Sequence, residues 1–413
     1  MKWALSKVED VALQEKGAIV SGPFGSNISS KFFVDEGVPV IRGNNLTFGQ
    51  RRFIDDGFVY LTEAKAREFR NCEAVADDLV FTAAGTIGQV GIIPQDTRFN
   101  RYIISNKQLR VRCDRTKVNP LFLFLWFTTN EMRQHIINRN TGCSIPLINL
   151  GILRGLPVPV PPLEIQDRIA SILSAYDDLI ENNNRRIKLL ETSARLLYRE
   201  WFVQLRFPGY EHTRIVDGVP EGWERTYVPD IIDIDPKTTV SKDGEKWFVE
   251  MGCLSTGSMM ILNPAMRDGL SGSKFKNGDT LLPRITPCLE NGKTGYVNFL
   301  ADDETAFGST EFIVLRGKKV PSEFVYCMAR AYAFRAKAIK SMIGSSGRQR
   351  VQKTCFDDFL APLPPKFIVE QFTDSARPMF YQIKNLMGQN HKLKTVRDLL
   401  LPRLMDGRVE IVI

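Results

Sequence analysis

The clearest pattern in the chain is a stripe of hydrophobic residues that follows Pro162 and recurs every three or four positions, with charged residues between its members. Its members are Ile165, Ile169, Ile172, Tyr176, Leu179, Asn183, Ile187, Leu190, Ala194, Leu197 and Trp201. This spacing is typical of the seam of a coiled coil. It predicts a helix from Leu163 to Phe202, which would be about 60 Å long at a rise of about 1.5 Å per residue.

A second stripe of similar length lies near the C-terminus. Its members are Ile368, Phe372, Met379, Ile383, Leu386, Asn390, Leu393, Leu400 and Leu404. Pro378 interrupts the early part of this stripe. Because a proline inside a helix costs about 3 kcal/mol, we expect the second helix to kink or restart there.

Each stripe has two explanations: a helix packed on its own domain, or one of two helices that pair with each other. Pairing is the better explanation, because two matched stripes are separated by a whole domain. Asn183 and Asn390 would then fix the register of the pair, unless they lie at its edge in water. We expect pairing contacts at Ile169, Ile172, Tyr176, Asn183, Ile187, Leu190, Leu197, Ile383, Leu386, Asn390, Leu393 and Leu400.

The two stripes belong to an internal repeat of the whole chain. PVPVPPLE, which ends at Glu164, recurs as LAPLPPKF, which ends at Phe367, at an offset of 203 residues. With small changes of offset, Asp78 of ADDLVF corresponds to Asp279 of NGDTLL. Because the matches keep their order and nearly their spacing, a duplication explains them better than chance.

Each half of the repeat resembles a mixed domain followed by a long helix. The first half has strand-like segments in VPVIR, DLVFTAAG, QVGIIP and NKQLRVRC, and a helical segment over residues 120–139. The second half has KWFVEM, TLLPRI, GYVNFL and EFIVLRG, and a helical segment from Ser322 to Lys340. The polar segment GYEHTRIVDGVPEGWE separates the halves near residue 215. The pattern predicts an α+β protein.

Composition narrows the class of protein. A chain of 413 residues is long enough for two to three domains, and 43% hydrophobic with 25% charged residues is ordinary for a globular protein. The longest apolar run, Leu121 to Phe127, is far shorter than the about 20 residues of a membrane helix. The start MKWALSKVEDVALQ has acids where a signal peptide has its apolar core, so we expect a cytoplasmic protein.

Cysteine and histidine usage gives no metal site. The seven cysteines are scattered singly without CxxC, and the three histidines lie far apart. An odd number of unclustered cysteines suits a reducing compartment.

The net charge of +8 is concentrated in two places. Residues 132–163 contain no acid, and neither does the corresponding stretch 324–356, although both contain several basic residues. A surface that contacts phosphates would exclude carboxylates in this way, whereas a solvated face normally mixes both signs. Each stretch contains a polar glycine loop, NRNTGCS or GSSGRQR. The partner predicted from charge is therefore a nucleic acid.

Arginine and glutamine in the second loop are the residue types that read guanine and adenine edges. The alternative, that these loops touch only the phosphate backbone, stays open. The candidate DNA contacts are Arg42, Asn44, Asn45, Arg51, Arg101, Lys107, Arg139, Ser144, Lys274, Arg284, Lys293, Arg348, Gln349 and Arg350.

Motifs for catalysis are missing from the sequence. It contains no GxxxxGK[ST], HExxH or GxSxG, no helicase signature, and no NPPY-type tetrapeptide of amino-methyltransferases. GPFGSN at Gly22 lacks the GxGxxG spacing of a cofactor loop and is better explained as a turn. We therefore expect a non-catalytic chain without catalytic, cofactor-binding or metal-binding residues.

Several of these segments together resemble the specificity subunit of type I restriction-modification systems. They are GPFGSN at Gly22, GTIGQVG at Gly85, RITPCLENGK at Arg284, GSTEF at Gly308, and the proline hinge before a long helix, which occurs twice. The resemblance covers essentially the whole chain.

The resemblance implies two target-recognition domains, each reading one half of a bipartite, asymmetric DNA sequence, separated by two long helices that form an antiparallel coiled coil with pseudo-twofold symmetry. Carried onto this sequence, the domains are residues 1–157 and 208–360, and the spacer helices are residues 158–207 and 361–413.

The resemblance also implies partners. Such a subunit recruits two modification subunits, which bind S-adenosylmethionine and methylate adenine, and restriction subunits can join them. It binds no cofactor itself, and Mg²⁺ and ATP are expected in the partner subunits. The alternative function is a helical adaptor that binds RNA or acidic proteins through its basic faces without reading bases.

Overall fold

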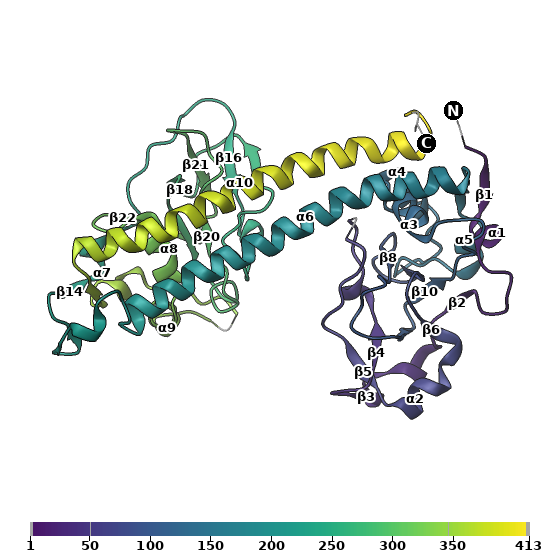
Figure 1. The fold of residues 1–413 in the computed structure, drawn as a ribbon, viewed down its shortest axis with the longest axis horizontal. Coiled ribbons are helices and arrows are strands. Elements are labelled where there is room, and N and C mark those ends of the chain that lie inside the picture. The colour runs from purple at the N-terminus through teal and green to yellow at the C-terminus, as the bar shows by residue number, and fades with distance from the viewer. Residues whose placement is uncertain (1–2, 50, 346, 410–413) are drawn as a thin grey trace. The chain divides into compact units, whose positions relative to one another are not determined.

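The computed structural model describes residues 3–49, 51–345 and 347–409 of the chain. The chain divides into two compact units, Met1–Glu181 with His391–Ile413 (unit 1) and Asn182–Asn390 (unit 2). The longest helices, α6 (Leu163–Tyr198) and α10 (Lys366–Met405), each have residues in both units (Figure 1). Both units mix helices and sheets, which confirms the predicted α+β class.

Unit 1 contains a five-stranded sheet of order β3-β5-β4-β9-β6, a four-stranded sheet of order β2-β10-β7-β8, and the pair β1-β11. Its strands are β1 (Leu5–Lys7), β2 (Ile19–Ser21), β3 (Phe33–Val34), β4 (Val38–Ile41), β5 (Val59–Leu61), β6 (Glu73–Ala74), β7 (Leu79–Thr82), β8 (Val90–Ile92), β9 (Tyr102–Ile104), β10 (Gln108–Val111) and β11 (Pro157–Pro159). Its shorter helices are α1 (Val8–Val11), α2 (Glu63–Glu68), α3 (Pro120–Thr128), α4 (Asn130–Ile137) and α5 (Leu150–Arg154).

Unit 2 contains two four-stranded sheets, of order β15-β22-β19-β20 and β17-β16-β21-β18, and the pairs β14-β23 and β12-β13. Its strands are β12 (Ile215–Val216), β13 (Val219–Pro220), β14 (Glu224–Tyr227), β15 (Ile232–Ile234), β16 (Lys246–Val249), β17 (Ala265–Arg267), β18 (Ser273–Lys276), β19 (Thr280–Pro283), β20 (Gly295–Tyr296), β21 (Thr305–Gly308), β22 (Phe312–Gly317) and β23 (Leu360–Leu363). Its shorter helices are α7 (Val228–Ile231), α8 (Ser322–Arg330) and α9 (Tyr332–Lys340).

The two units share one topology. The order β2-β10-β7-β8 in unit 1 corresponds to β15-β22-β19-β20 in unit 2, and β5-β4-β9-β6 corresponds to β17-β16-β21-β18. In the second pair of sheets the central strands are parallel, β4 with β9 and β16 with β21, and their outer neighbours are antiparallel. The internal repeat predicted from the sequence is confirmed at the level of topology.

A buried ion pair recurs at the same place in both units. In unit 1, Arg112, the residue that follows β10, donates from Nε and Nη2 to the two carboxylate oxygens of Asp78, at 2.9 and 2.7 Å. In unit 2, Arg316 on β22 donates in the same way to Asp279, at 2.7 and 2.6 Å. Both aspartates are buried, so their carboxylates need charge compensation. Arg316 provides it for Asp279, and Arg112 together with Arg110, whose Nη1 lies 3.5 Å from Oδ2, provides it for Asp78.

The longest apolar run of the sequence forms helix α3, which is almost entirely buried. Asn119 caps this helix by accepting from the backbone N–H groups of Leu121 and Phe122. The helix ends at Thr128, because Thr129 adopts an extended conformation and caps α4 with its hydroxyl. The predicted helix over residues 120–139 is thus two helices, and the predicted helix Ser322–Lys340 is likewise divided into α8 and α9.

The long helices differ from their prediction in three details. Helix α6 is followed by a π-helical turn at Arg199–Val203, and α10 ends at Met405, while residues 410–413 lie outside the described residues. Leu179 is 51% exposed, and Ile180 is buried in its place. Helix α10 does not restart at Pro378, because that proline is exposed and the carbonyl it leaves without an intrahelical donor can be hydrated.

Within each unit the two long helices lie side by side (Figure 1). In unit 1, Asp177 of α6 forms an ion pair of 2.6 Å with Arg397 of α10. In unit 2, Asn183 donates to Asn390 at 2.9 Å, and Asn390 donates to Asn184 at 2.9 Å.

The same helix surfaces also pack on the sheets and shorter helices. In unit 1, Ile169 and Leu173 share a hydrophobic core with Leu401 and with Phe122 of α3. All twelve residues predicted for helix pairing are buried or half-buried. The two explanations for the stripes, pairing and packing on the domain, therefore apply together.

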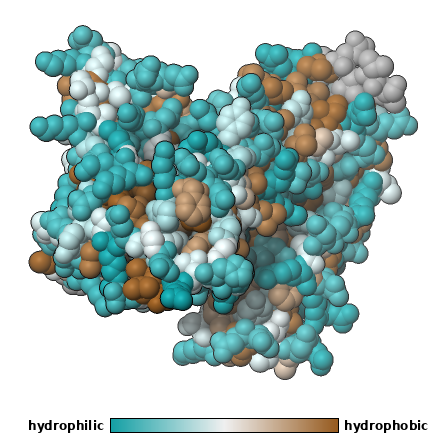
Figure 2. Space-filling view, turned by 60° about the vertical axis from the view of Figure 1, so that its left-hand side comes forward, coloured by the Kyte–Doolittle hydropathy of each residue, from teal (hydrophilic) through white to brown (hydrophobic). Residues whose placement is uncertain are grey.

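The surface seen in Figure 2 is mostly hydrophilic, with apolar side chains in separate patches of limited extent. Within residues 3–49, 51–345 and 347–409, no helix is both long and apolar enough to cross a membrane. The same residues contain no cluster of histidine, cysteine or acidic side chains placed to hold a metal ion. All seven cysteines are free thiols.

Candidate nucleic-acid interface

In unit 2, the polar loop after α9 is held against the end of strand β19. Thr286 donates its backbone N–H to the carbonyl of Gln349 at 3.1 Å, and the backbone N–H of Gln349 donates to the Thr286 hydroxyl at 3.1 Å. Gly344 has a φ of 138°, and a Cβ there would lie 2.9 Å from a backbone oxygen, so the turn requires glycine. Ser346, in the middle of this loop, lies outside the described residues.

The loop brings two predicted arginines to one glutamate. Arg350 donates from Nε and Nη2 to the carboxylate of Glu311, at 3.0 and 2.7 Å. Arg284 lies at the same carboxylate, with Nε 4.0 Å from Oε2. The hydrogen bonds from Arg350 hold the pKa of the Glu311 carboxyl below its usual value. Arg348, also predicted, is exposed two residues before Arg350 in the chain.

Other basic residues of the acid-free stretch turn inward. Arg330 donates to the carbonyl of Gly292 at 2.6 Å, and Arg335 donates to the carbonyl of Leu289. Lys293, a predicted DNA contact outside this stretch, lies in the segment between β19 and β20 and donates to the carbonyl of Met251 at 2.9 Å. These three cations hold the segment between β19 and β20 in place, so part of the positive charge in this region has a structural use.

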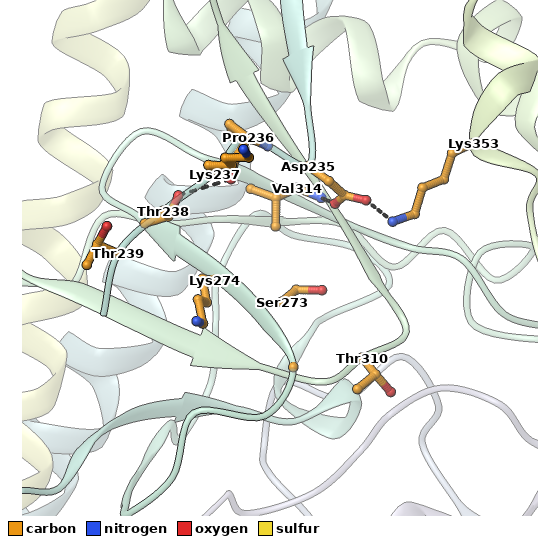
Figure 3. Close-up of a pocket in the computed structure, with 11 residues that line it drawn as sticks. Asp235, Pro236, Lys237, Thr238, Thr239, Ser273, Lys274, Thr310, Val314 and Lys353 are labelled. Atoms are coloured by element: carbon orange, nitrogen blue, oxygen red, sulfur yellow. Dashed lines mark hydrogen bonds and ion pairs between the residues drawn. The ribbon is translucent and has the colours of Figure 1, made fainter. Parts of the chain in front are cut away.

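Unit 2 also has a polar pocket of about 520 Å³ (Figure 3). Two of its lining residues, Thr310 and Lys353, are close along the chain to Glu311 and Arg350. Three lysines line it, Lys237, Lys274 and Lys353. Lys353 forms an ion pair with Asp235, the dashed contact on the right of Figure 3. Lys274 was predicted as a DNA contact, whereas Lys237 and Lys353 were not. Lys353 could have been predicted as a candidate, because it lies in the acid-free stretch 324–356.

The corresponding loop of unit 1 has the same support with other side chains. Asn140 shapes it by accepting from the backbone N–H groups of Gly142 and Leu147, at 2.9 and 2.8 Å. A Cβ on Gly142 would lie 1.9 Å from the carbonyl of Ile145, so only glycine fits. The predicted residues Arg139 and Ser144 are exposed on this loop.

The remaining candidates of unit 1 have different surroundings. Arg51 and Lys107 are exposed, and Asn44 is exposed with its amide bonded to the carbonyl of Gly57 at 3.2 Å. Arg101 is held by Glu63 and Glu73 in ion pairs, and the hydrogen bond that it donates to Glu63 raises its pKa.

Asn45 needs a correction. It is fully buried, and its amide donates to the carbonyls of Ile54 and Asp56 while its oxygen accepts from the backbone N–H of Arg42. Arg42 is half-buried. Asn45 therefore stabilises the loop between β4 and β5, and we remove it from the candidate DNA contacts because it has no free edge to offer a base.

Glu311 is the functional candidate that sequence reasoning missed. Its motif GSTEF was noticed, but a search for cations that contact phosphate excludes an acidic residue. The pairing of β19 with β22 places Arg284 beside Glu311, and the bridge between Ile285 and Arg350 brings Arg350 to the same carboxylate.

Comparison with known proteins gives one consistent family. Residues 2–192 match the type I restriction modification DNA specificity domain. The type I restriction enzyme MjaIX specificity subunit of Methanocaldococcus jannaschii is 24% identical over 426 residues, which cover 99% of this chain and 94% of that protein. The type I restriction enzyme EcoAI specificity subunit of Escherichia coli is 31% identical over 154 residues, which cover 36% of this chain and 26% of that protein.

A solved structure has the same fold. The type I restriction-modification system S subunit from M. genitalium aligns with a TM-score of 0.58 at 12% identity, covering 100% of this chain and 97% of that chain. The resemblance predicted from the sequence is confirmed: residues 2–192 match the type I restriction modification DNA specificity domain, and the chain is similar over nearly its whole length to a specificity subunit of a type I restriction enzyme.

Proposed function

We propose that this chain is the cytoplasmic DNA sequence-recognition subunit of a type I restriction-modification complex, and that units 1 and 2 each read one half of a bipartite, asymmetric target. The observation that carries the proposal is the repeat itself. One fold occurs twice, with a polar glycine loop in an acid-free stretch at the same place, and the side chains on the two loops differ. Two units with the same fold but different loop side chains suit a DNA target whose two halves differ in sequence.

The chain acts in this proposal without chemistry of its own. It recruits two modification subunits, which bind S-adenosylmethionine and methylate adenine, and restriction subunits that use Mg²⁺ and ATP. The family match and the similarity to specificity subunits of restriction enzymes support this assignment. The proposed domains are residues 1–157 and 208–360, with spacer helices in 158–207 and 361–413.

The proposed DNA contacts fall into two groups. The cations that line the pocket of Figure 3, such as the exposed Lys237 and the half-buried Lys274, are the proposed contacts to phosphates, which position a protein without reading sequence. Side chains on the glycine loops, Ser144 in unit 1 and Arg348 to Arg350 in unit 2, are the proposed contacts to base edges.

Methylome sequencing of cells that express the chain with its modification partner tests the proposal. We expect adenine methylation at a split motif with a fixed nonspecific gap. A hybrid in which residues 1–157 come from a relative should change one half of that motif and leave the other half unchanged. A continuous motif, or no new methylation, contradicts the proposal.

The adaptor alternative makes a different prediction. A protein that contacts only phosphates binds any duplex with similar affinity, and that affinity falls steeply as salt rises. Competition between target and unrelated duplex at about 150 mM salt separates the two functions, because a sequence-reading subunit keeps a preference for its target under these conditions.

A further inference from the structure

The two units support their polar loops through the same backbone hydrogen bonds. In unit 1, the N–H of Ala83 donates to the carbonyl of Lys107 at 2.7 Å, and the carbonyl of Ala83 accepts from Ile148 at 2.9 Å. Ala84 pairs with Leu147 across an antiparallel bridge. These contacts bring Ala83, Lys107 and Leu147 together at the end of strand β7.

Unit 2 has the equivalent contacts. The N–H of Arg284 donates to the carbonyl of Glu311 at 2.9 Å, and the carbonyl of Arg284 accepts from Val351 at 2.8 Å. Ile285 pairs with Arg350 across an antiparallel bridge. Three positions therefore correspond between the units: Ala83 to Arg284, Lys107 to Glu311, and Leu147 to Arg350.

The side chains at these three positions differ in charge and polarity between the two units. Unit 1 presents an exposed lysine beside an exposed leucine, with no acid among the three. Unit 2 presents Arg350, whose side chain is 46% exposed, fixed by Glu311, whose side chain is 22% exposed. An ion pair this exposed adds little to stability, so the fold alone gives little reason for it.

The geometry leaves one edge of Arg350 available. Glu311 accepts from Nε and Nη2, the lateral edge of the guanidinium. The terminal edge, formed by Nη1 and the second hydrogen of Nη2, has no hydrogen-bond partner among the described residues. A guanidinium edge of this kind matches the O6 and N7 acceptors of guanine, and a carboxylate beside it can accept from N4 of the paired cytosine.

We propose that the half-target read by unit 2 contains a G·C base pair, that Arg350 reads its guanine, and that Glu311 is the positioning residue that directs Arg350. Unit 1 has Leu147 at the corresponding position and offers no such edge. This inference rests on the proposed function and adds the identity of one base pair and the residues that read it.

The test compares methylation motifs of variants in the complex with the modification subunits. The half that a 1–157 hybrid leaves unchanged belongs to unit 2, and it should contain an obligatory G·C pair. R350K keeps the charge but loses the two-pronged donor, so discrimination at that pair should fall by roughly 5- to 150-fold, while the other positions stay strict. R267K is the matched control, because Arg267 is an exposed arginine of the same unit that pairs with Glu250 and is not a proposed DNA contact, and it should leave that discrimination intact.

E311Q separates positioning from structure. It keeps the shape of the side chain and removes its charge, so it should relax the preference at the same base pair while the melting temperature of the chain stays within about 2 °C of the parent. A lower melting temperature with an unchanged motif would show that Glu311 only supports the fold.

The two proposals fail in different ways. If the parent chain directs no split-motif methylation, the proposed function fails. If the motif is split but the half of unit 2 lacks an obligatory G·C pair, or if R350K methylates with unchanged discrimination, only the base assignment is overturned.

Discussion

Glu191 provides the sharpest test of how unit 2 is attached to its long helix. Its side chain projects from α6 and is buried, with 2% of its surface exposed. One carboxylate oxygen accepts from the Tyr326 hydroxyl at 2.5 Å, and the other accepts from the backbone N–H of Met259 at 2.8 Å. Burial and the nearby Glu191 charge raise the pKa of Tyr326 well above its usual value, so the hydroxyl stays protonated and donates.

The magnitude follows from the two donors. E191L replaces the carboxylate by a side chain that accepts no hydrogen bond, and leaves the hydroxyl and the N–H buried without partners. Each unsatisfied donor costs about 1–3 kcal/mol, so the free energy of unfolding of unit 2 should fall by about 2–6 kcal/mol. In the double variant E191L/Y326F one of these donors is gone, so the combined loss should be smaller than the sum of the single losses.

Urea unfolding of the full chain, combined with hydrogen exchange of α6 and α8 peptides, measures this loss. The exchange measurement assigns it to unit 2 even if the two units unfold separately. E370L is the matched control, because Glu370 lies on α10 in the same unit, with its side chain 60% exposed. Its effect should stay within about 0.5 kcal/mol. If E191L is no more harmful than E370L, the buried carboxylate does not hold the helix.

The other predictions concern single residues in each unit. D279N breaks the buried pair with Arg316 and should lower the free energy of unfolding of unit 2 by about 3–5 kcal/mol, seen as faster hydrogen exchange in β19 and β22 while unit 1 is unchanged. Burial lowers the pKa of His135 in the folded chain, so its contribution to stability is present above the ordinary value of 6.5 and is lost as the pH falls below it. Unfolding midpoints of the parent chain should therefore drop more between pH 7.5 and pH 5.5 than those of H135Q, and equal drops would refute this. P378A restores a backbone donor at an exposed site of α10 and should raise the melting temperature, whereas a decrease would show that the proline is required there.

The repeat and the long helices could be predicted because their signals are local. Residues three or four apart lie on one face of a helix, so the stripes identify α6 and α10 without any knowledge of the sheets. The prediction that Asn183 and Asn390 share the seam rests on the same periodicity, and the structure places them in hydrogen-bond contact.

The residues that the sequence could not place depend on contacts between distant segments. Leu179 and Ile180 are adjacent and equally apolar, and only the packing within unit 1 decides that Ile180 is buried. Glu191 is a residue type that normally lies in solvent, but its carboxylate is buried and accepts hydrogen bonds from Tyr326 and Met259, which are distant in the sequence. The same reason hid the role of Asn45, since its partners lie up to eleven residues away on the other side of a loop.

The positive charge of unit 2 illustrates why composition cannot locate a reading surface. The stretch 324–356 contains no acid, yet its arginines have different uses. Arg335 donates to a backbone carbonyl, and burial lowers its pKa, so it belongs to the fold. Arg350 is paired instead with Glu311, which comes from outside the stretch and leaves one edge of the guanidinium exposed. Two arginines fifteen residues apart in one acid-free segment should thus respond differently to substitution. R335K should lower the stability of unit 2 and with it the methylation of every DNA sequence, whereas R350K should alter discrimination at one base pair.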